Sequence, residues 1–424
     1  MFPAMSDAKS PPQPAPQPHA TFFRQSGWLM IASIGCGMVF YLVHLLSKKI
    51  TEAEYGAFGV MLAVAMCVPN MPLQMVFAQQ TAKAQLNGRE RALAGMIRLA
   101  LLGTLALVLL LAVGVGLWQT QIMAAWKLPS LAGLWMTVLV VLLSFWLPIF
   151  LGLMQGQQNF LWLGWDNILH GLGRLAVAGV LVLFFAGAST EMIAGVCFGL
   201  VVAVGIGVWQ TRNLWTLRAE SFDVRELLGQ MVPLMLGFFA VQFLFTADTM
   251  FVRACFTAQD SGFYVGAGTM SRALLWLVLP MATVMFPKIV HSAARAEKSN
   301  LLRLVMVGTI ILAAGGALGL TILAPWVIRF AFKDSYVAVA AAVLPWYAWA
   351  MVPLSLANVL VNNLLARSQF RIVPVLLVLA VAYGVALTQF HGSLITVLKT
   401  LGIFNLLLLA ACGWFTWREQ APKI

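Results

Sequence analysis

Charged residues are scarce in this chain. Asp, Glu, Lys and Arg together make up 9% of its 424 residues, whereas hydrophobic residues make up 61%. A soluble domain of this length needs far more polar surface than so few charges supply. A soluble globular fold is therefore excluded, and the expected solvent of most of the chain is a lipid bilayer.

Motifs with a defined chemistry are missing as well. The five cysteines are scattered without a C-x-x-C pair, so nothing supports a disulfide framework or a zinc site. Neither G-x-x-x-x-G-K-[ST] nor H-E-x-x-H occurs. Without nucleotide hydrolysis, any transport draws on an ion gradient, the membrane potential or the substrate's own gradient. We expect no metal or cofactor beyond optional coupling to H⁺ or Na⁺.

What the chain does contain is a series of long apolar stretches. About 20 residues cross the hydrocarbon core of a bilayer as a helix, and the alternating polarity of a membrane barrel is absent. The sequence therefore predicts an all-α membrane protein of about twelve spanning helices. The predicted spans are residues 28–47, 57–79, 95–117, 132–154, 164–186, 190–210, 229–252, 263–286, 301–324, 338–364, 372–390 and 394–416.

The basic residues predict the orientation. When the N-terminus is taken as cytoplasmic, most of the 26 Lys and Arg residues fall on the inside. The positive-inside rule then places both termini in the cytoplasm. The same distribution explains the net charge of +12 without a nucleic-acid partner. Arg98 and Arg303 lie at the cytoplasmic ends of their spans, whereas Arg174, Arg272 and Lys399 lie inside long apolar stretches and are counted on neither side.

A mixed-charge segment divides the spans into two sets of six. The pattern T-x-x-[DE]-x-G-x-[FY] follows the first span of each set, at residues 51–58 and 257–264, which indicates duplication. Two parallel six-helix repeats predict a substrate site between two lobes that rock around it. The expected division is a disordered cytoplasmic tail (1–24), an N-terminal lobe (25–211), a cytoplasmic linker (212–228), a C-terminal lobe (229–417) and a second cytoplasmic tail (418–424).

The cations within the spans are the strongest candidates for a site. One cation at the bilayer centre costs about 2.5 to 3.5 kcal/mol on insertion scales, so these side chains are expected to face a wet, protein-lined cavity. Lys399 lies nearer the outer face, where it either lines that cavity or extends to the interface. Arg24 precedes the first span and is either interfacial or placed at the cytoplasmic mouth.

Acidic and histidine side chains accompany the two arginines. Asp166, His170 and Arg174 are spaced by four and share one helical face, either as a local ion pair with a satisfied histidine or as part of the cavity. Asp248 and Arg272 lie on adjacent predicted helices. They form either a structural salt bridge or a site in which Asp248 couples an ion and Arg272 binds an anion. Asp166 and His170 are further candidates for ion coupling.

Several segments give the chain a family resemblance. Residues 46–56, 247–248, 262–264, 330–336 and 364–368 resemble the Wzx-like oligosaccharide flippases of the multidrug/oligosaccharidyl-lipid/polysaccharide exporter superfamily. The resemblance implies two six-helix lobes in a V around a cationic cavity. It also implies alternating access in a bacterial inner membrane, with a polyprenyl-diphosphate-linked oligosaccharide carried from the cytoplasmic to the outer leaflet. The expected partners are that substrate, membrane lipids, glycosyltransferases and a glycan polymerase. Arg174, Arg272 and Asp248 match the cavity, and Lys399 matches it less closely.

Two other functions fit parts of the same sequence. An ion-coupled antiporter for drugs or organic cations shares the superfamily, but acids would then be expected to outnumber cations within the membrane. A membrane glycan polymerase or ligase would present large outer loops with catalytic acids or histidines. The longest outer loops predicted here, near residues 117–131 and 325–337, are short. The sequence therefore favours a transporter over an enzyme.

Overall fold

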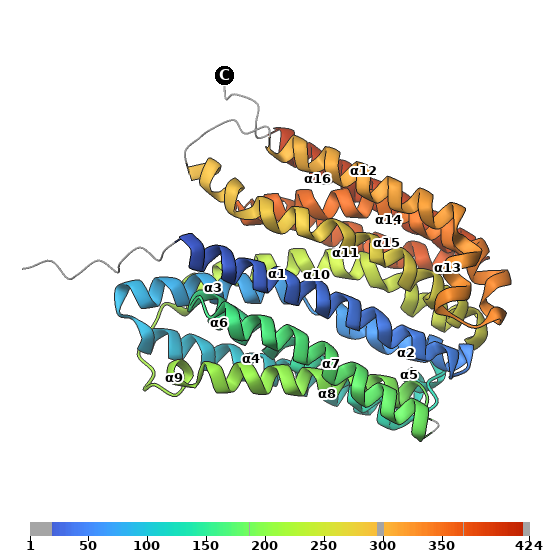
Figure 1. Ribbon diagram of the computed structural model, residues 1–424, viewed down its shortest axis with the longest axis horizontal. Coiled ribbons are helices and arrows are strands. Elements are labelled where there is room, and N and C mark those ends of the chain that lie inside the picture. Colours follow the sequence, from blue (N-terminus) through green and yellow to red (C-terminus); the bar gives the residue numbers. More distant parts are fainter. Residues whose placement is uncertain (1–18, 186, 295–300, 368, 419–424) are drawn as a thin grey trace, which may run out of the picture.

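The computed structural model describes residues 19–185, 187–294, 301–367 and 369–418. Within these ranges the regular structure is entirely helical (Figure 1). The helices of the N-terminal half are α1 (His19–Leu42), α2 (Glu52–Met66), α3 (Asn70–Asn87), α4 (Glu90–Leu117), α5 (Gln119–Ala125), α6 (Leu131–Gly156), α7 (Phe160–Phe184), α8 (Ser189–Gln210) and α9 (Arg212–Trp215). Those of the C-terminal half are α10 (Val224–Cys255), α11 (Ala258–Ala294), α12 (Leu301–Ile322), α13 (Ala324–Ala331), α14 (Val337–Ala366), α15 (Val373–Gln389) and α16 (Leu394–Arg418). Short 3-10 helices cover Val43–Lys48, Asp334–Tyr336 and Phe370–Ile372.

The predicted spans correspond to these helices. Among the described residues, 11 segments are long and apolar enough to cross a membrane. The predicted span 263–286 lies within α11, where part of the side chains falls outside the description. The predicted span 57–79 is interrupted between α2 and α3. Val68 precedes Pro69 at this break, and a residue before proline is disfavoured in helical conformation.

The helices form two lobes arranged as a V. In Figure 1 the lobes meet at the end that carries α5 and α13, which we call the distal end, and they diverge toward the end where α1 begins and α16 ends. We call this second end the terminal end. In the N-terminal lobe α7 packs on α1 and α8, while α6 packs on α3 and α8. In the C-terminal lobe α14 packs on α11, α12 and α16, and α10 packs on α15.

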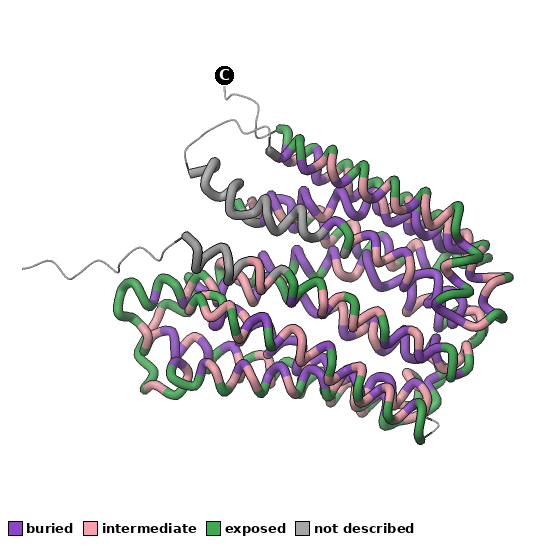
Figure 2. The backbone as a smooth tube through the Cα atoms, in the orientation of Figure 1, coloured by how far each residue is buried: buried purple, intermediate pink, exposed green. Residues whose placement is uncertain are grey.

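The lobes contact each other mainly through α2 and α3 on one side and α10 and α11 on the other. Buried residues run along these facing helices and through the interior of each lobe, whereas many apolar residues on the outer helix faces are exposed (Figure 2). Large exposed apolar side chains in α4 and α12 reach well over half exposure, such as 70% for Leu110 and 66% for Ile311. Such surfaces suit contact with lipid rather than water.

The repeated sequence pattern forms matching structures in the two lobes. Thr51 caps α2 by accepting a hydrogen bond from the backbone N–H of Glu54 at 3.3 Å, and Thr257 accepts one from Asp260 at 3.0 Å just before α11. The two glycines of the pattern meet across the lobe interface. A Cβ added to Gly262 would lie 2.0 Å from the Glu52 carbonyl oxygen. The repeated glycine is therefore required by the close approach of α2 and α11.

Candidate functional site

A buried ion pair links α10 to α11. Arg272 Nη2 lies 2.9 Å from Asp248 Oδ1; the Asp248 side chain is fully buried, whereas that of Arg272 is 13% exposed. The same nitrogen also donates to Thr249 Oγ1 at 2.9 Å and to the Phe245 carbonyl oxygen at 3.1 Å. Two residues that the sequence places on adjacent helices are thus a pair in the folded chain. Mutual neutralisation offsets much of the cost of burying them.

Two tyrosines complete the surroundings of Asp248. The Tyr264 hydroxyl donates to Asp248 Oδ2 at 2.9 Å, and the Tyr347 hydroxyl donates to the same oxygen. The Arg272 guanidinium group also lies over two rings, 5.2 Å from the Phe245 centroid and 5.4 Å from that of Tyr347. Nothing in the local sequence shows that these tyrosines contact Asp248, although Tyr264 belongs to the repeated pattern. Tyr347 lies on α14, so only the fold brings it to Asp248.

The three residues spaced by four on α7 face α1. The helix begins after Asn159, whose side chain accepts a hydrogen bond from the backbone N–H of Trp162 at 3.4 Å. The Arg174 guanidinium group lies 5.2 Å from the Phe40 ring centroid on α1, and the His170 ring meets the same ring edge-on at 4.9 Å. The predicted stack on one helical face is therefore directed into the interior of the N-terminal lobe.

The charges on this face do not neutralise one another. Asp166 is fully buried and Arg174 is 7% exposed. Neither carboxylate oxygen of Asp166, and neither Nε nor Nη2 of Arg174, has a hydrogen-bond partner among the residues that the structure describes. Eight residues of helix separate them by about 12 Å, too far for direct pairing. The local ion pair that the spacing allowed does not form between these two residues.

Lys399 lies apart from these groups. Its side chain is exposed, and its Nζ lies 5.3 Å from the centroid of the Trp346 ring on α14. It lines an open, largely apolar cavity of about 320 Å³ together with Phe390 and Ile403. Its described contacts join it to neither Arg174 nor Arg272, a position that agrees with the interfacial alternative. The side chain of Arg24 falls outside the described residues.

Arg253 closes the distal end of the molecule. The sequence places it in an outer loop, but its side chain is only 2% exposed. It donates to the carbonyl oxygens of Trp126 at 2.7 Å, Ala53 at 2.9 Å and Lys127 at 2.6 Å, all in the other lobe. Lys127 donates in return to the carbonyl oxygen of Phe256 at 2.6 Å. A cation that would otherwise be solvated is buried here because backbone oxygens of the facing lobe surround it.

Further hydrogen bonds link the lobes near this end. Lys333 donates to the Ile50 carbonyl oxygen at 2.7 Å. Tyr55 on α2 contacts Thr269 on α11, with 3.2 Å between the hydroxyl oxygens, and lies 2.8 Å from His44 Nδ1. His44 is 9% exposed and is therefore buried together with Tyr55. These contacts keep the distal end closed.

Comparison with a family of known proteins gives one match. The family described as "Polysaccharide biosynthesis protein" matches residues 22–293, which is more than half of the chain. The matched region contains nearly all of α1, the rest of the N-terminal lobe, α10 and nearly all of α11. No curated protein matches the chain.

Several solved structures have a similar fold. An inward-facing multidrug resistance MATE family transporter aligns with a TM-score of 0.73 at 9% identity, covering 90% of this chain and 94% of that one. The lipid II flippase MurJ in an inward closed conformation aligns with a TM-score of 0.68 at 14% identity, covering 92% of this chain and 87% of that one. An outward-facing MATE transporter gives 0.61 at 12% identity, covering 94% and 96%. These proteins share the two-lobe helical fold with this chain.

Proposed function

The chain belongs to the polysaccharide biosynthesis protein family, and from this premise we propose that it flips a polyprenyl-diphosphate-linked oligosaccharide across a membrane. The proposed direction is from the cytoplasmic to the outer leaflet of the bacterial inner membrane, with both termini in the cytoplasm. In this proposal glycosyltransferases supply the substrate and a glycan polymerase uses the flipped product. The chain performs no covalent step.

The observation that carries the proposal is the pair of arginines within the apolar bundle. Arg272 is held by Asp248 and two aromatic rings yet keeps 13% of its side chain exposed. Arg174 is buried without a counter-ion among the described residues. A diphosphate that leaves water needs cationic partners, and arginine offers a permanently charged, planar set of donors for phosphate oxygens. Binding an anion would also offset the cost of burying Arg174.

The membrane potential suffices as a driving force. Moving one negative charge out of an inside-negative cell is favourable by about 2.3 kcal/mol per 100 mV. A headgroup with about two negative charges would therefore gain roughly 4 to 5 kcal/mol if the protein moves no compensating charge. Coupling to H⁺ or Na⁺ through Asp166, His170 or Asp248 is consequently optional in this mechanism.

Alternating access would use the closed distal end as a gate. The contacts of Arg253, Lys127 and Lys333 hold this end shut while the lobes diverge at the terminal end (Figure 1). Release of the substrate to the outer leaflet requires these contacts to break and the lobes to rock. Two rigid six-helix repeats around a central site support such a motion.

An antiporter for organic cations is the second candidate. The observation that favours it is Asp166, a fully buried carboxylate whose two oxygens have no partner in the described part of the chain. A cationic drug or coupling ion would be attracted to this position. It is the weaker candidate because Arg174, on the same face of α7 about 12 Å away, would repel the same cation.

Reconstitution tests the proposed function. Proteoliposomes that hold the purified chain and a fluorescent polyprenyl-diphosphate oligosaccharide in one leaflet should show protein-dependent movement of the label to the other leaflet. Arg272→Ala should abolish this movement, and Arg272→Lys should restore part of it. If the wild-type chain moves an organic cation but not the lipid-linked glycan, the antiporter is correct. If the chain moves neither compound but forms new glycosidic bonds in the lipid-linked glycan, it is an enzyme.

A further inference from the structure

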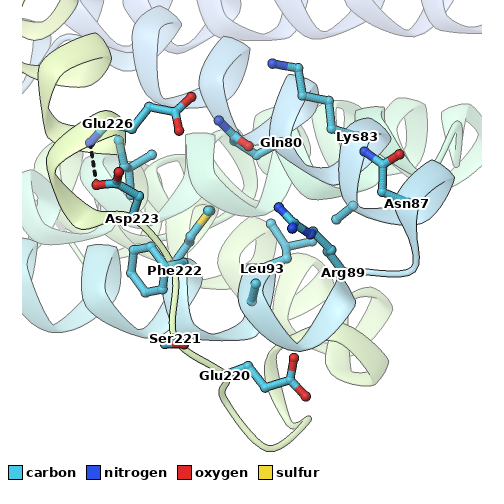
Figure 3. A pocket seen from close by; sticks show the side chains of 14 residues that line it. Gln80, Lys83, Asn87, Arg89, Leu93, Glu220, Ser221, Phe222, Asp223 and Glu226 are labelled. Atoms are coloured by element: carbon cyan, nitrogen blue, oxygen red, sulfur yellow. Dashed lines mark hydrogen bonds between the residues drawn. The ribbon is translucent and has the colours of Figure 1, made fainter.

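A cavity of about 610 Å³ lies at the terminal end, away from the arginines described above (Figure 3). The C-terminal part of α3 and the start of α4 form one wall, and residues 220–223 with the first turn of α10 form the other. The cavity therefore lies where the N-terminal lobe meets the first helix of the C-terminal lobe. Its size falls within the range of about 300 to 1,000 Å³ that is usual for small-molecule sites.

Opposite charges share this cavity without pairing across it. Lys83 and Arg89 line it together with Asp223 and Glu226, but none of the four takes part in an ion pair within the described ranges. In Figure 3 the carboxylates of Asp223 and Glu226 lie to one side and Lys83 and Arg89 to the other, with the Gln80 amide between them, whereas the Glu220 carboxylate lies below Arg89. The cavity thus offers both hydrogen-bond donors and hydrogen-bond acceptors.

The wall formed by residues 220–223 is fixed in place by α4. Arg98 donates to the carbonyl oxygens of Trp215 at 3.2 Å and Leu217 at 2.6 Å, and the Glu220 backbone N–H donates to the Arg91 carbonyl oxygen at 3.2 Å. At Gly95 an added Cβ would lie 3.0 Å from both the Glu220 carbonyl oxygen and the Phe222 ring. Only this close approach lets the half-buried Phe222 ring line the cavity.

The lining selects a neutral, hydroxyl-rich ligand. Glu220 is paired with Arg91 at 3.1 Å, so the remaining carboxylates, Asp223 and Glu226, are balanced by Lys83 and Arg89. The lining therefore carries no net charge and favours neither a polyanion nor a cation. Hydroxyl groups can donate to the carboxylates and accept from amides and cations at the same time. The C–H faces of a sugar ring also pack well on an aromatic ring such as that of Phe222.

We propose that this cavity binds the oligosaccharide portion of the lipid-linked substrate at the cytoplasmic face, before the lobes reorient. The inference rests on the proposed function and adds the place where the glycan is recognised. Glu226 and Asp248 are 22 residues apart on α10, which corresponds to about 33 Å of helix. The cavity and Arg272 therefore act in succession for a short glycan: the sugars bind first, and the diphosphate reaches the arginines later.

The ligand bridges two lobes in this arrangement. Gln80 and Asn87 belong to α3, and Glu226 belongs to α10. A rocking motion that separates or twists α3 relative to α10 changes the spacing of these groups. Rotation of the lobes therefore releases the glycan from the cavity, so recognition and reorientation are coupled by the geometry of the site.

Binding of the free glycan tests the proposal without requiring transport. The probe is the oligosaccharide released by mild acid from the lipid-linked intermediate that accumulates in a strain lacking this chain. Isothermal titration with the full chain in phosphatidylethanolamine and phosphatidylglycerol nanodiscs should give saturable binding. Glu226→Gln and Asn87→Ala should each weaken binding, with a Kd raised at least about tenfold. Gln79→Ala, an exposed neighbour of Gln80 outside the cavity, serves as the matched control and should bind as the wild type does.

Two outcomes would overturn the inference. One is wild-type affinity in both cavity variants, and the other is displacement of the glycan by inorganic diphosphate, which would make the cavity an anion site. Phe222→Trp supplies an independent readout: because the chain already has 15 tryptophans, the signal is the glycan-dependent change in fluorescence of the variant beyond that of the wild type. Arg272→Ala should leave binding of the free glycan unchanged while abolishing flipping. Failure of flipping in the wild-type chain would count against the proposed function alone.

Discussion

Arg253 at the end of α10 donates a 2.9 Å hydrogen bond to the carbonyl oxygen of Ala53 in α2, so a fully buried cation joins the two lobes. No carboxylate takes part in an ion pair with Arg253 in the described part of the chain. Backbone carbonyl oxygens of Ala53, Trp126 and Lys127 in the opposite lobe solvate it instead. The bond can exist only while the distal end is closed, because its partners belong to different rigid bodies.

Arg253→Ala should therefore open the distal end. Hydrogen bonds to a charged group contribute about 1.5 to 3 kcal/mol each, and this substitution removes several that cross the lobe interface. In a background without the native cysteines, Ser47→Cys, which is buried in the closed form, should react several-fold faster with a membrane-impermeant maleimide. Arg329→Ala removes only an exposed pair with Asp334 and should leave the reaction rate unchanged. Equal rates in all three proteins would contradict the gate.

Gly262→Ala should destabilise the closed form. The added Cβ would lie 2.0 Å from the Glu52 carbonyl oxygen, so α2 and α11 must move apart. Overpacking of this kind costs about 1 to 3 kcal/mol, and the thermal unfolding midpoint in detergent should fall by several degrees. Gly319→Ala on α12 meets nothing within 4 Å and should leave the midpoint unchanged or slightly raised. A Gly262 variant as stable as the control would mean that the interface is looser than described.

Substitutions of the buried pair Asp248 and Arg272, on α10 and α11, should affect stability and transport differently. Asp248→Asn alone leaves Arg272 without its counter-ion, and breaking a buried pair costs about 3 to 5 kcal/mol. Changing both residues, as Asp248→Asn with Arg272→Gln, should recover much of that stability, as measured by thermal unfolding, but no flipping. Full flipping by the double variant would remove Arg272 from the substrate path. If Asp248→Asn retains transport with an unchanged ion dependence, Asp248 only positions Arg272.

Substitutions on α7 should distinguish the anion site from the coupling site. Arg174→Ala should abolish surface glycan in a complementation assay while the chain still reaches the membrane, and Arg174→Lys should restore part of it. Asp166→Asn should retain binding of the lipid-linked substrate but lose any dependence of flipping on a proton or sodium gradient. The measurement is flipping in proteoliposomes with and without each gradient. Normal surface glycan in the Arg174→Ala strain would refute the cationic cavity at this position.

Lys399 should contribute little to flipping. Its ammonium group lies over the Trp346 ring, and its side chain is exposed. Lys399→Gln should therefore keep at least half of the wild-type flipping rate in proteoliposomes. Loss comparable to that of Arg272→Ala would place Lys399 in the substrate path despite its position.

Much of the architecture could be predicted because a bilayer imposes strict rules. A polar backbone in hydrocarbon must form helices, so apolar stretches of sufficient length identify spans almost independently of tertiary context. The predicted span 57–79 crosses the break before Pro69, because hydropathy over a window does not show where one helix ends and the next begins. Spacing by four also placed Asp166, His170 and Arg174 on one face of α7 correctly, since helical geometry alone decides it.

Long-range partners could not be predicted in the same way. Arg253 and Lys127 read as loop cations, because nothing in the local sequence shows that carbonyl groups of another lobe surround them. Tyr347 is 99 residues from Asp248 and reaches it only through the packing of α14. The cavity at the terminal end likewise combines residues 80–96 with residues 220–227.

The sequence by itself determined that this chain is a helical membrane protein with two related halves, because composition, span length and a repeated capping pattern are local properties. Only the tertiary structure decided which cations are paired, which are left without a counter-ion and which close the distal end. The cost of a buried charge depends on the groups around it, and those groups come from helices far apart in the chain.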